Sequence, residues 1–488
     1  MSIAEISPVG LPQSLKYDNL PSCPESLNSY MISVAPSGIT QVSGATLNTV
    51  VFDADDPGLV NQNFNSQNLD FQIPCGNSDA LFLDTRETTL SGRMTIVVST
   101  AGTGATNGRF NLIGSFASFF DALTLFSSNV PIEQVYNYGI LFNQMLNSTV
   151  NSSERYGSMT ISSGADENSF GGIDIPYTNT GTYYFNFSIP LISILGLNTS
   201  GTSNKLLPIG SIANLMLRMT TSASLPFATY CTAITQQPVF TTTLDQFNLN
   251  LRYVNIGDMA SSLLKQTLYD GKFYIKSTCY TGSNASIPSG SFGAVSLPLQ
   301  IRQSSVKSLF YQFGINKSTK CPNGYFDAIN PNIISSQVNI GGSRFPSRPL
   351  NLAQRPAEAF QSYLQSWGSV SLKGIGGLMY RGSYSPLLNQ VAGADNSCVV
   401  PANAVRAVSA SDTTTQVIVA FPHMSYHGFD LERCGGTIFS GINTRMAAPF
   451  LELQIATALT DSVTCFAFAM SDCIIKIDPA TKTCEVLV

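Results

Sequence analysis

Residues 247–254 read FNLNLRYV, and this stretch decides the fold class. Apolar residues stand at every second position from Phe247 to Tyr253, and asparagine or arginine stands between them. Successive side chains of a β-strand point to opposite faces. The alternation therefore predicts a strand with one face in a core and the other face polar.

The same alternation recurs along the chain, for example in residues 94–99 and 295–302. Clusters of Gly, Ser, Asn and Thr lie between the strand-like runs. Two of them, residues 101–108 and 281–290, predict loops. Many short strands separated by polar turns predict an all-β sandwich or barrel.

Helices are expected to be few and short. Four apolar residues have the i, i+3, i+4, i+7 spacing of one helix face: Phe116, Phe119, Phe120 and Leu123. Pro131 is expected to open a following helix that extends to about Met145, and Pro356 to open another. The helix after Pro356 is expected to have four residues on one face: Ala357, Phe360, Leu364 and Trp367.

The two halves of the chain share a pattern that suggests an internal duplication. In the first half, residues 183–189 (YYFNFSI) meet Pro190, and an alternating run follows at Leu215, Leu217 and Met219. In the second half, residues 416–421 (QVIVAF) meet Pro422, and a similar run follows after a comparable interval at Leu451, Leu453 and Ile455. The pattern predicts two similar sandwiches placed end to end.

The join between the sandwiches is expected in residues 255–271. Asp258 is expected to cap a short helix there that contains Met259, Leu263 and Leu264, and the next strand is expected to begin at Lys272. The predicted organisation has five parts: an N-terminal arm (1–30), a first sandwich (31–254), a linker with a short helix (255–271), a second sandwich (272–477) and a C-terminal tail (478–488).

The composition favours close packing against neighbours. Only 11% of the residues are charged, against roughly a quarter in ordinary soluble domains. Uncharged polar residues take their place, as in residues 61–67 (NQNFNSQ). These side chains cost less to desolvate than ions, so a surface built from them can be buried without stranding unpaired charge.

Charge and hydropathy argue against two classes of protein. The net charge is −5 and lysine and arginine form no cluster, so electrostatic wrapping of nucleic acid is not expected. The most basic series, Arg344, Arg348 and Arg355, is widely spaced and predicts a loop or interface role. No apolar run approaches the roughly 18–20 residues that span a bilayer. The amino terminus lacks the pattern of a secretory signal.

Residues that often carry chemistry form no recognisable site. His423 and His427 are the only histidines, and their spacing would suit a metal ion on a helix, but Pro422 and Gly428 beside them favour a turn. The ten cysteines include no Cys-X-X-Cys pair and are expected to be reduced, mostly buried thiols.

Two further motifs favour simple structural roles. Residues 373–377 (KGIGG) lack the spacing of a phosphate-binding loop, and residues 53–58 (DADDPG) favour a polar turn over a calcium or glycosidase site. No catalytic residue, cofactor-binding residue, metal ligand or cofactor is expected, and the protein is expected not to be an enzyme.

Part of the second half resembles a known family. Residues 335–351 (SSQVNIGGSRFPSRPLN) and the PAEAFQSYL that starts at Pro356 resemble the second jelly roll of double jelly-roll major capsid proteins. So do residues 428–432 (GFDLE), 440–444 (SGINT) and 448–455 (APFLELQI). The resemblance is to the proteins of polinton-like viruses and virophages, in the lineage that includes adenovirus hexon. The first half agrees with the family in size and β-pattern.

The resemblance implies an all-β fold of two tandem eight-stranded jelly-roll β-sandwiches, with a few short helices in loops. It implies a major capsid protein of a DNA virus that forms homotrimeric, pseudo-hexameric capsomers and tiles an icosahedral shell. The implied partners are neighbouring capsomers and minor capsid and penton proteins, without sequence-specific nucleic-acid binding. The implied location is the virion, after assembly in the host cytoplasm or nucleus.

Two other functions remain open. A carbohydrate-binding adhesin or receptor-binding spike would also be β-rich and low in charge, although such proteins more often carry a secretory signal or fibrous repeats. A β-sandwich glycoside hydrolase is the enzymatic rival. The single tryptophan, Trp367, counts against the hydrolase because sugar subsites usually stack on several aromatic rings.

Overall fold

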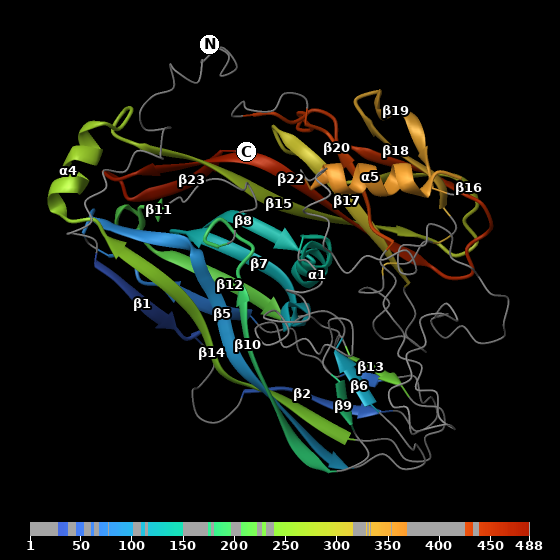
Figure 1. Cartoon of the computed structure of the whole chain (residues 1–488), viewed down its shortest axis with the longest axis horizontal. Coiled ribbons are helices and arrows are strands. Elements are labelled where there is room, and N and C mark those ends of the chain that lie inside the picture. Colours follow the sequence, from blue (N-terminus) through green and yellow to red (C-terminus); the bar gives the residue numbers. More distant parts are fainter. Residues whose placement is uncertain are drawn as a thin grey trace.

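A computed structural model of the 488-residue chain shows an all-β protein (Figure 1). It describes residues 28–37, 45–52, 60–62, 68–76, 78–100, 109–112, 116–149, 174–176, 180–196, 206–221, 227–230, 239–315, 328, 331, 333–352, 354–367, 425–432 and 439–487.

The first half of the chain contains two facing antiparallel sheets. One has the strand order β10-β5-β14-β2-β3, with β1 pairing along the rest of β14 and β11 pairing β5. Its strands are β1 (Asn28–Val34), β2 (Ala45–Phe52), β3 (Val60–Gln62), β5 (Leu81–Thr100), β10 (Gly181–Pro190), β11 (Leu206–Leu207) and β14 (Val239–Asn255). The other has the order β4-β12-β7-β8. Its strands are β4 (Asn68–Ile73), β7 (Phe120–Ser127), β8 (Val130–Tyr136) and β12 (Leu215–Thr221).

The second half repeats this plan. One sheet has the order β15-β22-β17-β20, with β23 added at β22, and the other has the order β16-β21-β18-β19. The strands are β15 (Phe273–Ile287), β16 (Gly293–Pro298), β17 (Val306–Ile315), β18 (Ile333–Ile340), β19 (Ser343–Asn351), β20 (His427–Asp430), β21 (Phe450–Ile455), β22 (Val463–Asp478) and β23 (Thr483–Leu487).

The two halves share one topology. When the main strands of each half are counted in chain order, with β1 and β2 together as the first, one sheet reads first, eighth, third, sixth. The other sheet reads second, seventh, fourth, fifth. This order in two packed sheets is that of an eight-stranded jelly roll, so the chain folds as two jelly rolls in tandem.

The predicted duplication rests on two correspondences, the strand-proline pattern and the leucine runs, and the structure confirms the second. The runs at Leu215 and Leu451 form β12 and β21, which are the seventh strands of the two rolls. Residues 416–422, the other half of the strand-proline pattern, lie outside the described residues. Among the described residues, the sixth strand of the second roll is β20, which comes after residues 416–422 in the chain.

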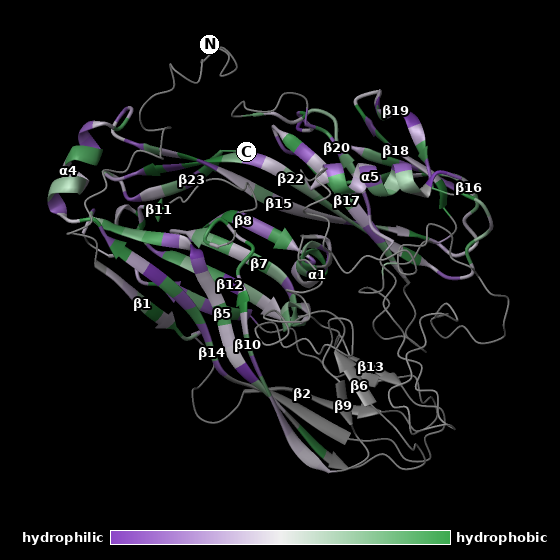
Figure 2. Cartoon of the chain, in the orientation of Figure 1, coloured by the Kyte–Doolittle hydropathy of each residue, from purple (hydrophilic) through white to green (hydrophobic). Residues whose placement is uncertain are grey.

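The strand faces follow the predicted alternation. In β14, the apolar residues from Phe247 to Tyr253 are at most 5% exposed, whereas the residues between them are only partly buried. In Figure 2 the residue colours change repeatedly along β5 and β14 as apolar and polar side chains alternate. The sheet that contains β14 therefore contributes one apolar face to a core, as a sandwich requires.

Three α-helices connect strands in the described part of the chain: α1 (Tyr138–Thr149), α4 (Asp258–Gln266) and α5 (Pro356–Ser366). Short 3₁₀ turns occur at η4 (Phe116–Phe119) and η5 (Ile209–Ser211), and a small third sheet has the order β13-β6-β9. Its strands are β6 (Arg109–Leu112), β9 (Asp174–Pro176) and β13 (Phe227–Tyr230). None of the described helices is long and apolar enough to cross a membrane.

The prediction of a helix from Pro131 to about Met145 is wrong in its first half. Residues 131–136 belong to β8, and α1 begins only at Tyr138. β8 is the edge strand of its sheet, so a proline there need not interrupt the ladder between two neighbours. The helical spacing that starts at Phe116 is likewise only one 3₁₀ turn, because Phe120 begins β7.

Three other local predictions need correction. Residues 281–287, expected in a loop, continue β15. Asp258 lies in the first turn of α4, where its negative charge suits the helix dipole, and the N-cap is Gly257. α5 begins at Pro356 as predicted, but Ala357 is exposed and the buried face includes Ala359 and Tyr363.

One hydrophobic cluster, the shared core, extends through both rolls. It joins Phe71 and Phe247 of the first roll to Phe310 and Phe468 of the second. Gly282 of β15 allows the two rolls to approach closely, because a Cβ atom there would lie 2.5 Å from the Tyr136 carbonyl oxygen of β8. A second cluster fills the second roll alone.

Strand β23 also joins the rolls. It pairs with β22 and lies against β7 and β8 of the first roll. The Ala213 amide donates a 3.0 Å hydrogen bond to the Lys482 carbonyl just before β23. Cys484 and Val486 of β23 pack into the shared cluster.

Candidate functional site

The predicted histidine pair does not form a described metal site. His423 lies outside the described residues, whereas His427 begins β20 and is 2% exposed. The centroid of its ring lies 5.3 Å from that of the Tyr311 ring, and its Nε2 lies 3.2 Å from Ser425 Oγ. Burial lowers the pKa of His427 to about 3. The side chain is therefore a neutral part of the core at ordinary pH.

The three arginines singled out in the sequence form surface ion pairs. Arg344 pairs with Glu452 at 3.1 Å, and Arg348 and Arg355 pair with Glu358 at 2.6 Å and 3.7 Å. All three arginine side chains are more than half exposed. The loop part of the prediction is wrong for Arg344 and Arg348, which lie in β19, whereas Arg355 directly precedes α5. The interface role stays a prediction.

Other predicted residues have structural surroundings or lie outside the described part. The described cysteines are free, and four are buried: Cys279, Cys465, Cys473 and Cys484. The Trp367 ring packs against the Phe310 ring in the shared core, with 4.3 Å between the ring centroids. Two further motifs lie outside the described residues: 53–58 and 373–377. The described residues hold no group of three or more His, Cys, Asp or Glu side chains able to bind a metal ion.

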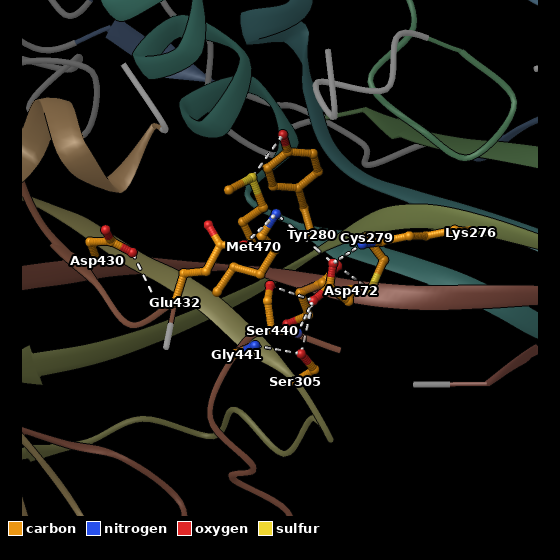
Figure 3. Close-up of polar contacts among 12 residues, drawn as sticks. Lys276, Cys279, Tyr280, Ser305, Asp430, Glu432, Ser440, Gly441, Met470 and Asp472 are labelled. Carbon is orange, nitrogen blue, oxygen red and sulfur yellow. Dashed lines mark hydrogen bonds and ion pairs between the residues drawn. The ribbon is translucent and has the colours of Figure 1, made fainter. Parts of the chain in front are cut away.

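A buried polar cluster around Asp472 was missed in the sequence. Asp472 lies in β22 and is 1% exposed. Its Oδ2 accepts hydrogen bonds from Ser305 Oγ at 2.9 Å, Ser440 N at 2.9 Å and Ser440 Oγ at 3.1 Å, as Figure 3 shows. Its Oδ1 lies 3.7 Å from Lys276 Nζ and 3.9 Å from Lys307 Nζ. The carboxylate is therefore compensated from both sides.

The Asp472 cluster fixes a loop of the second roll. Ser305 Oγ also accepts a 2.9 Å hydrogen bond from the Gly441 amide, and Val306 and Ile442 exchange two backbone bonds. A Cβ atom on Gly441 would collide with the Val306 carbonyl, so glycine is needed at this contact. The cluster thus holds residues 440–442 against the start of β17, which is a structural role. An acidic residue inside the apolar run of residues 463–478 was its only sequence signal.

A cavity of about 670 Å³ lies between the rolls. β8 forms one wall, and β15 with Gln300 and Gln303 forms the other. Its described lining includes two carboxylates, Asp121 and Glu133, and no lysine, arginine or histidine.

Glu133 belongs to the wall of this cavity but is directed into the first roll. Glu133 is 6% exposed, and its Oε2 accepts hydrogen bonds from Ser193 Oγ at 2.5 Å and Ile194 N at 3.0 Å. The hydroxyl of Tyr138 accepts a 3.0 Å bond from the neighbouring Ile192 amide. Burial outweighs these hydrogen bonds and raises the pKa of Glu133 to about 7. Through these hydrogen bonds the carboxyl group stabilises the turn of residues 191–196.

Comparisons with known proteins give a match in structure alone. No protein-family model and no curated protein sequence matches the chain. Solved structures match over nearly the whole length. The capsid of the virus PBCV-1 matches with a TM-score of 0.50 and 11% identity, covering 92% of this chain and 94% of that one. The chain has the double jelly-roll fold.

Two further double jelly-roll structures agree. The mavirus major capsid protein matches with a TM-score of 0.50 and 10% identity, covering 93% of this chain and 89% of that one. The Sputnik virophage structure matches with a TM-score of 0.51 and 9% identity, covering 94% and 88%. Both rolls and their connection therefore fall within the match, which confirms the fold predicted from the resemblance.

Proposed function

We propose that this double jelly-roll chain is a major capsid protein, whose copies form homotrimers that pack side by side into an icosahedral shell. The observation that carries the proposal is the repeated strand order: two rolls of one topology, joined by a shared core within a single chain. The similar structures support it, since they are described as a virus capsid, a major capsid protein and a virophage.

The two-roll unit suits a flat hexagonal lattice. Three copies around a threefold axis would present six rolls, giving a nearly hexagonal outline from a trimer. The shared core supports this use because a capsomer needs the two rolls of each chain to keep a fixed relation. Under this proposal the rolls correspond to residues 31–254 and 272–477, with the linker in residues 255–271.

The surface also suits repeated weak contacts. Charged residues make up 11% of the chain. Large apolar side chains are exposed on strands, on a helix and in loops: Val130, Tyr184, Met259, Phe292 and Met446. Each contact between capsomers need contribute little, because a shell multiplies it many times. We propose neighbouring capsomers and minor capsid and penton proteins as partners, the virion as the location, and no enzymatic role.

Mass photometry of the purified chain tests the trimer. We expect a main species of three times the chain mass, and negative-stain images with threefold symmetry and a hexagonal outline. A monomer at every protein and salt concentration would refute the trimer. Trimers that never form ordered arrays or particles under any assembly condition would refute the shell.

A further inference from the structure

We propose that the cavity between the two jelly rolls binds a neutral polyhydroxylated ligand, a saccharide unit, through amide and hydroxyl side chains and the ring of Tyr136. This goes beyond a capsid role, which needs no ligand there. The volume of about 670 Å³ falls within the roughly 300–1,000 Å³ of small-molecule sites.

The polar walls have the chemistry that sugars require. Five primary amides line the cavity: Gln134, Asn137, Asn284, Gln300 and Gln303. Two hydroxyl groups, those of Thr281 and Ser283, lie among them. An amide offers both donors and acceptors, as does each sugar hydroxyl, so the two groups pair without any net charge. The absence of lysine, arginine and histidine from the described lining disfavours an anionic ligand.

The β15 wall is held in place before any ligand arrives. Gln303 Nε2 donates a 2.9 Å hydrogen bond to Thr281 Oγ1. The backbone N–H of Gln300 donates a 3.0 Å hydrogen bond to Ser283 Oγ. The backbone of Gln303 exchanges hydrogen bonds with Thr444 at 2.8 Å and 2.9 Å. Fixed polar groups lose little conformational entropy when they bind, which favours recognition.

The wall on the side of the first roll supplies an aromatic ring from β8 and a carboxylate from β7. Tyr136 lines the cavity yet is 48% exposed, which leaves ring surface for the C–H face of a sugar. The Tyr136 backbone is fixed because its carbonyl oxygen packs against Gly282. Asp121 makes no hydrogen bond or ion pair within the described residues. Its carboxylate can accept a charge-assisted hydrogen bond from a ligand hydroxyl.

A cation is the competing ligand for Asp121. The second carboxylate of the cavity, Glu133, already accepts hydrogen bonds from Ser193 and Ile194. One available carboxylate is a poor ligand set for Ca²⁺, which takes six to eight oxygen atoms, often from several carboxylates. The larger number of neutral amide and hydroxyl groups favours the saccharide.

Saturation-transfer NMR on the purified full-length protein tests the site, with D-glucose, D-galactose and N-acetyl-D-glucosamine as probes. We expect at least one probe to bind with a Kd in the millimolar range. Tyr136→Ala should weaken that binding at least tenfold, and Gln303→Ala should also weaken it. Tyr184→Ala is the matched control, because Tyr184 is a 60% exposed tyrosine of β10 that does not line the cavity.

Three outcomes would overturn the proposal. No probe binds, or Tyr136→Ala and Tyr184→Ala bind the probe equally, or calorimetry detects Ca²⁺ binding that Asp121→Asn abolishes while no sugar binds. If Tyr136→Ala does not fold, Gln134→Ala on the exposed face of β8 replaces it. Mass photometry of the same samples reports the trimer separately, so failure of the sugar site and failure of the capsid proposal are distinguishable.

Discussion

Replacing Glu133 by glutamine should remove a large pH dependence from the stability of the protein. Burial raises the pKa of this carboxyl to about 7 from an ordinary 4.5. The fold therefore favours the protonated form. Its contribution to stability is fully present below pH 4.5 and is lost as the pH rises through 7. At about 1.4 kcal/mol per pKa unit, the loss between pH 4.5 and pH 8 is about 3 kcal/mol.

Urea unfolding measures the pH-dependent contribution of Glu133 to the free energy of unfolding. The wild type and Glu133→Gln are compared at fixed protein concentration and at pH 4.5, 6, 7 and 8. Glutamine is neutral and can still accept the Ile194 amide hydrogen bond, so the stability of the variant should lack the pH dependence that comes from Glu133. Subtracting the two profiles cancels every other titrating group. The stability of the variant relative to wild type should rise by about 3 kcal/mol across this range.

The control is Glu485→Gln, because Glu485 is an exposed carboxylate paired with Lys476 at the surface. Its profile should stay within about 1 kcal/mol of the wild type. Parallel profiles for the wild type and Glu133→Gln would refute the reasoning. They would mean that the Glu133 carboxyl is as well solvated in the folded protein as in the unfolded chain.

Three further substitutions test the fold. Gly282→Ala should lower the free energy of unfolding by about 1–3 kcal/mol because its Cβ would meet the Tyr136 carbonyl. Gly181→Ala, with 3.7 Å of clearance, should change it much less, and equal urea midpoints would contradict this packing. Asp472→Ala should cost about 3 kcal/mol by stranding buried hydrogen-bond donors, and a loss below about 1 kcal/mol would show that water replaces the carboxylate. His427 is neutral in the fold, so stability falls by up to about 1.4 kcal/mol per unit as the pH drops from 6.5 toward 3. His427→Gln should abolish that slope, and a slope shared by both proteins would assign it to other groups.

The strand pattern could be predicted from the sequence because it is local. The alternation from Phe247 to Tyr253 reflects one strand lying between core and polar surroundings, and any such strand carries the same signature. The repeat of Leu215 and Leu451 was visible for the same reason. Both form the seventh strand of a roll and have apolar residues on the core face.

The errors arose where distant contacts decide the local structure. Residues 131–136 form a strand because they pair with β7, and no local spacing records that pairing. The small residues around Gly282 resemble a loop, but at Gly282 itself a larger residue would meet the Tyr136 carbonyl of β8. The Asp472 cluster was hidden for a similar reason, since Ser305 lies 167 residues from Asp472 in the chain. Folding alone brings them together.

Strand β23 has a consequence for the order in which the protein matures on the ribosome. Of the described strands it is synthesised after every other, yet it packs against β7 and β8 of the first roll. A nascent chain that has completed only its first roll must therefore keep that apolar surface uncovered. Chains released early would lack this cover, and their exposed surface would mark them for chaperones or proteases before they could enter a particle.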